Sequence, residues 1–273
     1  MTLSIGLIQT NTGIDPVVEA ELLAAQIGEA AAKGAEIIFM PEMSGLLDRD
    51  RSRAASNIRD EADDAVLAAV RAAAARHHVW VHLGSLALRG TGNKFVNCGF
   101  LIGPDGEITA RYAKIHLFDV ALGTESWRES AAYDAGEEAV VAATPWGALG
   151  LTICYDVRFP ALHRALAEAG AQIIAVPAAF TRPTGQAHWH VLLRARAIET
   201  GCWVIATAQT GEHQDGRATY GHSLVISPWG EVVLDMGEAP GIGIATIDMA
   251  AVAAARGKVP ALEHARSFRV VGP

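Results

Sequence analysis

The sequence predicts an α/β protein built from two related halves. Short apolar runs, typical of buried strands, alternate along the 273 residues with longer segments of helical pattern. The chain is 51% hydrophobic, which is enough to bury a large core. Three segments of the first half also recur in the same order in the second half. No linker divides the chain, so we expect one domain over residues 1–273, with a C-terminal tail of about 20 residues.

Strands and helices alternate through the first half. A strand is expected at 3–8, followed by a helix that ends at Gly34, a residue type common after helix ends. A second, alanine-rich helix is expected over 62–77, and the residues before it, 43–60, are expected to form a loop. Pro and Gly at 103–106 favour a turn between the last two strands. The other strands of this half are expected at 36–40, 79–88, 95–102 and 107–112.

The second half begins after a long loop, expected over 115–137, that has no clear period. Helices are expected from Pro160 to Gly170 and over 187–200, with proline favoured in the first helical turn. The last 25 residues or so suggest a short helix and the tail. Strands are expected at 139–143, in the run before Cys154, and at 171–176, 202–208, 222–227, 231–234 and 242–247.

The internal repeat predicts two sheets related by a pseudo-twofold axis, each from a β-α-β-α-β-β unit. Segment 34–41 matches 170–177, and segment 102–107 matches 226–231. Gly6, Leu7 and Pro16 match Gly150, Leu151 and Pro160. Common turn and helix-stop residues could produce such matches by chance. If the repeat is real, Thr10 corresponds to Cys154 and Ala178 to Glu42, so one active site per chain is expected.

Charge and cysteine content exclude several classes of function. The formal net charge is −8, which disfavours a nucleic-acid or anionic-membrane partner. No apolar run reaches the roughly 18 residues of a membrane-spanning helix, and no basic segment precedes the first apolar run. The three cysteines contain no Cys-x-x-Cys pair, so we expect free thiols and a cytoplasmic location, without disulfides or a cysteine-zinc site.

Cys154 is the candidate nucleophile. It lies where a predicted strand ends and a turn leads to the helix at Pro160, and ligands bind at such strand ends in α/β sheets. The alternative is a small buried apolar residue, which is the usual place of a cysteine. A nucleophilic thiol needs a base or a cation beside it, because a free thiol is only a few per cent ionised at neutral pH.

Glu42, Lys114 and Glu129 are the candidate partners of the thiol. Glu42 and Lys114 follow predicted strands, and Glu129 lies in the long loop. The gaps of 72 residues (114 − 42) and 40 residues (154 − 114) allow no local motif, but strand ends converge on one rim. An apolar setting is expected to raise the pKa of Glu42 into the range of a general base. Each of the three could instead be an exposed surface residue.

These residues lie in segments that resemble the nitrilase superfamily of carbon–nitrogen hydrolases. The segments are FMPE at 39–42, YAKIHLFD at 112–119 and ICYDVRFP at 153–160. The resemblance implies a four-layer α-β-β-α sandwich that dimerises through helices flanking the Cys154 strand. It also implies that Cys154 is the nucleophile, Glu42 the general base and Lys114 the oxyanion stabiliser. Glu129 matches the second glutamate of the family, which supports Lys114 and the substrate.

Further segments at 180–189, 193–199, 208–211 and 220–223 resemble the Nit branch of this superfamily. The branch implies a small amide substrate that carries a carboxylate, such as deaminated glutathione. Arg158, Arg182 and Arg194 are candidate partners of that carboxylate, because a guanidinium can hold one with two hydrogen bonds. Tyr155, through its backbone N–H, and Phe180 are further candidates for contact with substrate.

Several alternatives remain open from the sequence. Within enzymes, an ω-amidase, an N-carbamoyl hydrolase or a nitrilase would use the same residues. A catalytically silent binding protein would retain the fold alone, and a redox sensor would need Cys98 or Cys202 as a resolving thiol. No metal or organic cofactor is expected: the histidines at 77, 78, 82, 188 and 190 lack carboxylates at ligand spacing.

Overall fold

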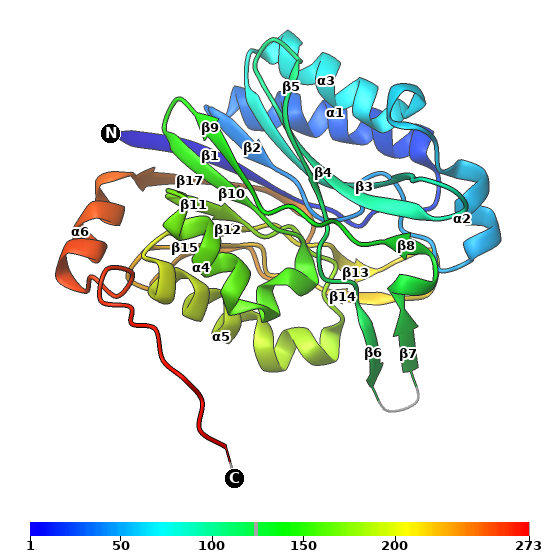
Figure 1. The fold of residues 1–273 in the computed structure, drawn as a ribbon. Helices are drawn as coiled ribbons and strands as arrows, with labels where there is room; N and C mark the ends of the chain where they lie inside the picture. Colours follow the sequence, from blue (N-terminus) through cyan, green and yellow to red (C-terminus); the bar gives the residue numbers. More distant parts are fainter. Residues whose placement is uncertain (123–124, 273) are drawn as a thin grey trace.

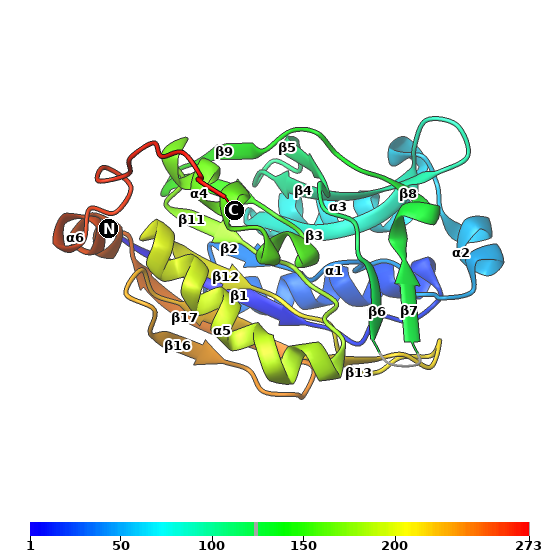
Figure 2. The same ribbon diagram turned by 60° about the horizontal axis from the view of Figure 1, so that its bottom comes forward.

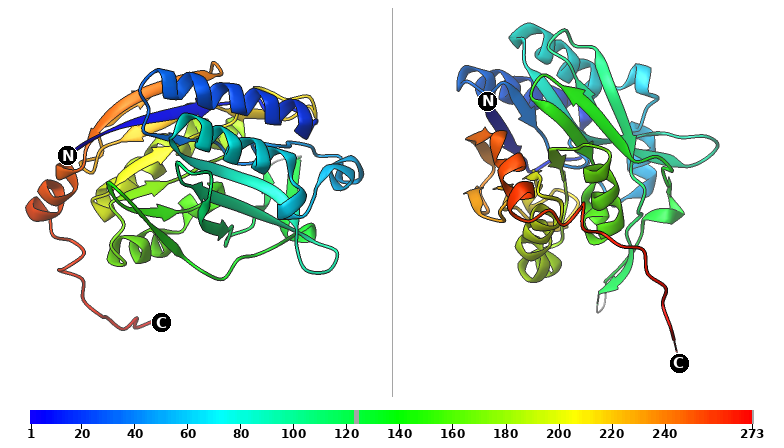
Figure 3. Two further views of the ribbon diagram at one scale, coloured as in Figure 1. Left: turned by 90° about the horizontal axis from the view of Figure 1, so that it is seen from above. Right: turned by 60° about the vertical axis from the view of Figure 1, so that its left-hand side comes forward.

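Two β-sheets pack face to face and carry helices on both outer faces in the computed structural model (Figure 1). The structure describes residues 1–122 and 125–272, so positions 123–124 of the expected loop and 273 of the expected tail lie outside the described residues. Helices α1 and α3 pack side by side on one face (Figure 3), and α4 and α5 lie on the other. The helices are α1 (Pro16–Ala32), α2 (Arg51–Asn57), α3 (Ala65–His77), α4 (Pro160–Glu168), α5 (Arg182–Thr200) and α6 (Ala250–Lys258), with short 3-10 turns η1 (Glu61–Asp63), η2 (Glu129–Ala131) and η3 (Cys154–Arg158).

The first sheet has the strand order β17-β1-β2-β3-β4-β5. Its central strands β1, β2 and β3 are parallel, and the neighbours outside them run antiparallel. A short strand, β8 (Tyr133–Asp134), adds to β4. The other strands are β1 (Thr2–Gln9), β2 (Ile37–Phe39), β3 (Trp80–Arg89), β4 (Phe95–Ile102), β5 (Ile108–Ala113) and β17 (Gly241–Asp248).

The second sheet repeats this topology in the order β16-β15-β12-β11-β10-β9. Strands β10, β11 and β12 are parallel, and β15 and β16 follow antiparallel, as β4 and β5 follow β3. Each half also places a helix between its first and second strands, α1 or α4, and a long helix between its second and third, α3 or α5; the first half adds the short α2 before α3. This is the topology that the internal repeat predicts. The strands are β9 (Val140–Thr144), β10 (Gly147–Leu151), β11 (Ile173–Ala175), β12 (Trp203–Ala206), β15 (Leu224–Ile226) and β16 (Val232–Asp235).

The core lies between the two sheets. The central strands β2, β11 and β12 are buried at every residue and do not alternate between apolar and polar side chains, because both faces of a parallel sheet are covered. Ile5 and Phe39 of the first sheet and Leu149 and Ile174 of the second belong to one buried cluster. A second cluster fills the space between the first sheet and helices α1 and α3. Burial of each large side chain stabilises the fold by about 1.5–3 kcal/mol.

Local signals in the sequence explain where the helices begin and end. The side chain of Asp15 accepts a hydrogen bond from the Val17 amide at the start of α1, and proline follows as the first helical residue. Asp64 caps α3 through the Leu67 amide at 2.8 Å. Gly201 adopts a left-handed conformation after α5, which glycine allows without strain.

Three expectations about loops and helix bounds were wrong. Residues 43–60 contain α2, a largely polar helix capped by Asp50, and its lack of an apolar stripe explains why no period indicated it. The expected loop at 115–137 contains the hairpin β6 (Asp119–Leu122) and β7 (Glu125–Arg128), which projects from the body of the molecule (Figure 2). Helix α5 begins at Arg182, five residues before the expected start at 187, with proline in its first turn. A further hairpin joins β13 (Thr210–Glu212) and β14 (Ala218–Tyr220).

After α6 the chain leaves the body as an extended tail (Figures 1 and 3). Across residues 1–122 and 125–272, none of the helices combines the length and the apolar character that a membrane span requires.

Candidate active site

The turns that follow β2, β5 and β10 bring Glu42, Lys114 and Cys154 into one buried cluster. Glu42 comes three residues after β2, Lys114 directly after β5, and Cys154 three residues after β10. Their exposed fractions are 5%, 2% and 8%, so the alternative of exposed surface residues is excluded for Glu42 and Lys114. Glu129 joins the cluster from η2, with its side chain also largely buried.

Lys114 is the centre of the cluster. Its Nζ donates to Glu42 Oε1 at 2.8 Å and to Glu129 Oε1 and Oε2 at 3.1 and 3.0 Å. Glu129 is itself fixed, because its Oε2 accepts a hydrogen bond from the Phe118 amide at 2.6 Å. The buried ammonium group is therefore paired with two carboxylates, which compensate the cost of removing its charge from water.

Glu42 is held from both halves of the chain. Its Oε2 accepts a hydrogen bond from the Ala179 amide at 2.9 Å, and its backbone carbonyl accepts one from Gln209 Nε2 at 3.0 Å. Its carboxylate also interacts with the thiol of Cys154. The carboxylate of Glu42 is thus hydrogen-bonded to the ammonium group, and its negative charge acts on the thiol.

Cys154 occupies a tight turn at the start of η3. Its φ angle is +47°, a left-handed conformation that residues with a Cβ atom rarely adopt and that costs about 1–3 kcal/mol. The Cys154 amide donates to the Pro177 carbonyl at 2.8 Å, which fixes the turn against the end of β11. The surrounding structure offsets this strain and holds the thiol against Glu42.

The charges of the cluster determine the protonation states. Burial is the largest single influence and raises the pKa of Glu42, but the ammonium of Lys114 and hydrogen bonds to Lys114, Cys154 and Asn97 together lower it by a larger amount, so the net shift is downward. Our expectation of a raised pKa for Glu42 was therefore wrong: its setting is buried but not apolar. Burial and the negative charge of Glu42 raise the pKa of Cys154 well above its usual value. The two carboxylates outweigh burial and raise the pKa of Lys114. The resting cluster thus holds a neutral thiol, an ionised Glu42 and a charged lysine.

Asn97, in β4, is a member of the cluster that the sequence analysis missed. Its Nδ2 donates to Glu42 Oε1 at 2.9 Å and to Glu129 Oε1 at 3.2 Å, so it bridges the two carboxylates. Its Oδ1 is buried and has no hydrogen-bond partner within the described part of the chain. Only its position in a strand beside β5 could have indicated this role.

Asp156 was also missed, although it lies within the Cys154 segment. It is fully buried, and its Oδ2 accepts from the Tyr112 hydroxyl at 2.7 Å and the Ile153 amide at 2.8 Å. Its Oδ1 accepts from the backbone amide and the ring Nδ1 of His116, at 3.1 and 2.7 Å. Asp156 therefore joins the turn that carries Cys154 to the segment that carries Lys114.

The four candidates for substrate contact lie around this cluster. Tyr155 packs edge-on against Phe118 and Phe159, with ring centroids 5.1 and 5.3 Å apart. The guanidinium of Arg158 lies 5.4 Å from the ring centre of Phe180. Phe180 directly follows Ala179, whose amide contacts Glu42. Tyr155 and Phe180 thus directly follow residues of the cluster or its contacts, Cys154 and Ala179, in the chain.

The arginines differ in how strongly they are already held. Arg182 begins α5 with a partly exposed side chain, and its Nη1 lies 3.7 Å from Glu212 in a long ion pair. Arg158 shares a contact of 3.2 Å with the ring of His188. Arg194 instead donates to the Gly230 carbonyl at 2.8 Å and joins α5 to the turn before β16. Arg194 is thus engaged in the packing of α5, whereas Arg158 and Arg182 lie closer in the chain to the cluster.

A four-layer sandwich with a buried cysteine, lysine and two glutamates at the ends of its strands is the architecture of the nitrilase superfamily. The chain belongs to the carbon–nitrogen hydrolase family, whose model matches residues 5–257.

Known relatives agree with this assignment over most of their length. The chain is 42% identical over 256 residues to the deaminated glutathione amidase of Synechocystis, which covers 90% of each protein. It is 41% identical over 250 residues to the human protein of that name, covering 89% of this chain and 76% of the relative. Among solved structures, the NitFhit protein of C. elegans matches with a TM-score of 0.88 and 37% identity. That match covers 97% of this chain and 65% of the other.

Proposed function

We propose that this hydrolase is a cysteine-dependent amidase in which Cys154 is the nucleophile, Glu42 the general base and Lys114 the oxyanion stabiliser. The observation that carries the proposal is the position of Glu42, which accepts a hydrogen bond from Lys114 Nζ at 2.8 Å and lies close enough to Cys154 for its negative charge to raise the pKa of the thiol. A nucleophile, a base in contact with it and a cation for the developing charge are the parts that acyl transfer requires.

Attack begins when an amide carbonyl enters beside Cys154. The thiol proton passes to Glu42, a bond forms between sulfur and carbon, and the carbonyl electron pair moves to oxygen. The ammonium of Lys114 and the Tyr155 N–H stabilise this oxyanion. Because the raised pKa of Cys154 keeps the resting thiol protonated, proton transfer accompanies attack rather than preceding it. Loss of one oxyanion donor typically lowers the rate by ~10²–10³-fold.

The intermediate then collapses to a thioester. The carbon–nitrogen bond breaks, and the proton on Glu42 passes to the leaving nitrogen, which departs as ammonia or an amine. Glu42 next takes a proton from water, whose oxygen attacks the thioester, and returns that proton to the sulfur. The products are a carboxylic acid and the free thiol. Glu129 holds Lys114 in place throughout, and the steps use groups of this chain, the substrate and one water molecule.

Deaminated glutathione, an amide with anionic ends, is the substrate that we propose. The relatives that are named deaminated glutathione amidase, at 39–42% identity, support it. Arg182 and Arg158 are the proposed partners of a substrate carboxylate. The ion pair of Arg182 with Glu212 is long and exposed, so it costs little to exchange for a substrate carboxylate.

Mass spectrometry of the full chain during turnover tests the nucleophile. A panel of amides, including deaminated glutathione, ω-amides, ureides and nitriles, should yield an acyl adduct on Cys154 with at least one member. Cys154→Ala should abolish adduct and turnover, whereas Cys98→Ala, which removes a buried thiol elsewhere in the core, should retain both. An adduct elsewhere, or turnover by Cys154→Ala, would contradict the assignment, and inactivity on the whole panel would favour a silent binding protein.

Substrate specificity is tested separately with Arg182→Ala. The expected result is a raised KM for anionic amides with little change for neutral amides. If the variant and the parent have equal KM values for anionic amides and for neutral amides, Arg182 does not bind the substrate carboxylate.

We also propose that the chain forms a homodimer through α4 and α5, in a cytoplasmic setting that keeps its thiols reduced. Val191 and Ile198 on α5 are 68% and 56% exposed, and Trp229 beside them is 54% exposed. Apolar side chains gathered on one helix face favour burial against a second copy. Light scattering should give twice the chain mass, and Val191→Asp should shift the mass toward that of one chain.

A further inference from the structure

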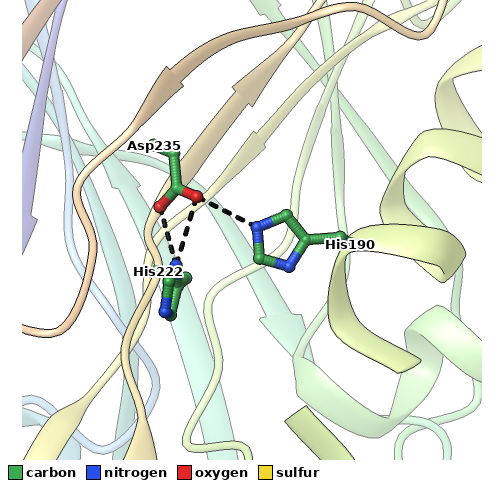
Figure 4. Close-up of side chains that lie close together, drawn as sticks. All are labelled: His190, His222 and Asp235. Atoms are coloured by element: carbon green, nitrogen blue, oxygen red, sulfur yellow. Dashed lines mark hydrogen bonds and ion pairs between the residues drawn. The ribbon is translucent and has the colours of Figure 1, made fainter. Parts of the chain in front are cut away.

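A second cluster of ligand-type side chains lies outside the catalytic site. His190 of α5, His222 between β14 and β15, and Asp235 at the end of β16 point toward one another (Figure 4). Asp235 Oδ2 lies 3.0 Å from His190 Nε2, and the two oxygens of Asp235 lie 2.9 and 3.1 Å from His222 Nδ1. One nitrogen from each histidine and one carboxylate oxygen lie within 4.8 Å of one another.

We propose that His190, His222 and Asp235 form a binding site for a divalent transition-metal ion of the Zn²⁺ type. Zinc binds imidazole nitrogen and carboxylate oxygen at about 2.0–2.2 Å, so two ligands of a tetrahedral site lie about 3.3 Å apart. The observed separations of 2.9–3.1 Å are within a few tenths of an ångström of that value. Each histidine nitrogen therefore already lies near the required distance from the Asp235 carboxylate, and the two nitrogens lie within 4.8 Å of each other.

The chemistry of the ligands suits zinc better than calcium or magnesium. Two imidazoles and one carboxylate favour ions such as Zn²⁺, whereas calcium and magnesium prefer oxygen ligands alone. Each histidine must present a lone pair, so the protons now directed at Asp235 move to the opposite ring nitrogens or to solvent as the ion binds. All three side chains are partly exposed, which leaves room for an ion to enter and for a water molecule as fourth ligand.

Neighbouring contacts hold two of the ligands in place before any ion binds. His222 has a φ of +55°, and its backbone carbonyl accepts a hydrogen bond from Trp189 Nε1 at 2.8 Å. Its ring stacks on Tyr220 with centroids 4.4 Å apart. The Gly237 amide donates to Asp235 Oδ1 at 2.9 Å. A non-glycine residue held in a left-handed conformation marks a position whose side-chain direction the structure enforces.

An ion at this site would join three separate elements. It would fasten the middle of α5 to the edge of the second sheet, across 45 residues of chain from His190 to Asp235. The first residues of α5 follow the segment with Ala179, whose amide holds Glu42. We therefore assign the site a stabilising role, because an ion that binds only the folded state raises its stability.

Zinc and cobalt titrations of the full-length Cys154→Ala variant test the proposal without competition from the catalytic thiol. Zinc at about a hundred times its Kd should raise the melting temperature by about 5 °C. Cobalt should bind with one ion per chain and give the visible absorption bands of tetrahedral coordination.

The ligand assignment is tested with His190→Ala and Asp235→Asn in the same background, and His264→Ala, an exposed histidine of the tail, is the matched control. Each ligand variant should weaken binding by ~10²-fold or more and lose the shift in melting temperature, whereas the control should retain both. Absence of one-to-one binding in the parent would overturn the proposal. Equal zinc shifts in the parent and both ligand variants would overturn it as well.

Discussion

Asp156→Asn should disconnect the turn of Cys154 from the segment of Lys114. The carboxylate accepts four hydrogen bonds, two on each oxygen. Asparagine keeps one acceptor oxygen, which can serve the two donors of His116. Its NH₂ group then faces the Tyr112 hydroxyl, which can rotate, and the Ile153 amide, which cannot.

The expected loss of stability follows from the donors left unpaired. A buried donor without a partner costs about 1–3 kcal/mol. Because the Ile153 amide is the donor left unpaired, Asp156→Asn should lower the free energy of unfolding by about 1–3 kcal/mol. Tyr112→Phe removes one hydrogen bond and leaves the other three, so its cost should be about 1 kcal/mol.

Activity should fall more in Asp156→Asn than in Tyr112→Phe, as the free energy of unfolding does. A displacement of about 1 Å between reacting groups can cost ~10²-fold in rate, so kcat of Asp156→Asn should fall by about that factor. Tyr112→Phe should stay within a few-fold of the parent. Urea unfolding and steady-state kinetics measure the two quantities. Parent-like stability and kcat in Asp156→Asn would refute the reasoning, and an equally severe Tyr112→Phe would assign the effect to the hydroxyl instead.

Further predictions concern the charge and the packing of the site. Because the pKa of Glu42 is lowered below 4.5, the acid limb of the pH profile of kcat/KM should lie below pH 4.5. The stabilisation that its charge gives the folded state should be present above pH 4.5 and disappear as the pH falls through the lowered pKa. An acid limb near pH 6 would contradict this prediction. Asn97→Asp should move the acid limb to a higher pH, because one ammonium group then faces three buried carboxylates. In urea unfolding, the same variant should lose on the order of 3–5 kcal/mol of the free energy of unfolding. Gly84→Ala should lower the free energy of unfolding by more than ~3 kcal/mol, because a Cβ atom there overlaps backbone carbonyls. Gly34→Ala has open space around it and should lower the free energy of unfolding by only about 1–2 kcal/mol, because of its left-handed φ. Equal losses of stability in calorimetry would contradict the packing argument.

Elements that bury an apolar face were predictable from the sequence, and those that do not were missed. The strand at 95–102 has the expected bounds, and α3 ends at His77 as expected, because apolar patterns and stop residues encode both. Helix α2 has one buried residue, Ala54, so its cap at Asp50 was the only local signal. The β6–β7 hairpin likewise lies on the outside of the fold, and none of its described side chains, at 119–121 and 126–128, is buried, so no buried face indicates strands at these positions.

The candidate site shows a similar division. Strand ends and motif segments identified Glu42, Lys114 and Cys154, since the turns after strands lie on a common edge. The direction of the pKa shift of Glu42 depends on a lysine 72 residues away, so apolar neighbours in sequence predicted the wrong sign. The sequence shows no carboxylate at ligand spacing from His190, because Asp235, which contacts His190 in the structure, lies 45 residues away on another element.

The repeat explains why two halves make one site. Ala178 corresponds in sequence to Glu42, and it offers no carboxylate, but the next amide, that of Ala179, donates to Glu42. Thr10 corresponds to Cys154, and its hydroxyl donates to Gln209, whose Nε2 holds the Glu42 carbonyl. Both positions without a reactive group therefore lie beside contacts that hold Glu42: Thr10 acts through Gln209, and Ala178 directly precedes the amide that binds the carboxylate. The asymmetry of the repeat is thus part of how the single site is held.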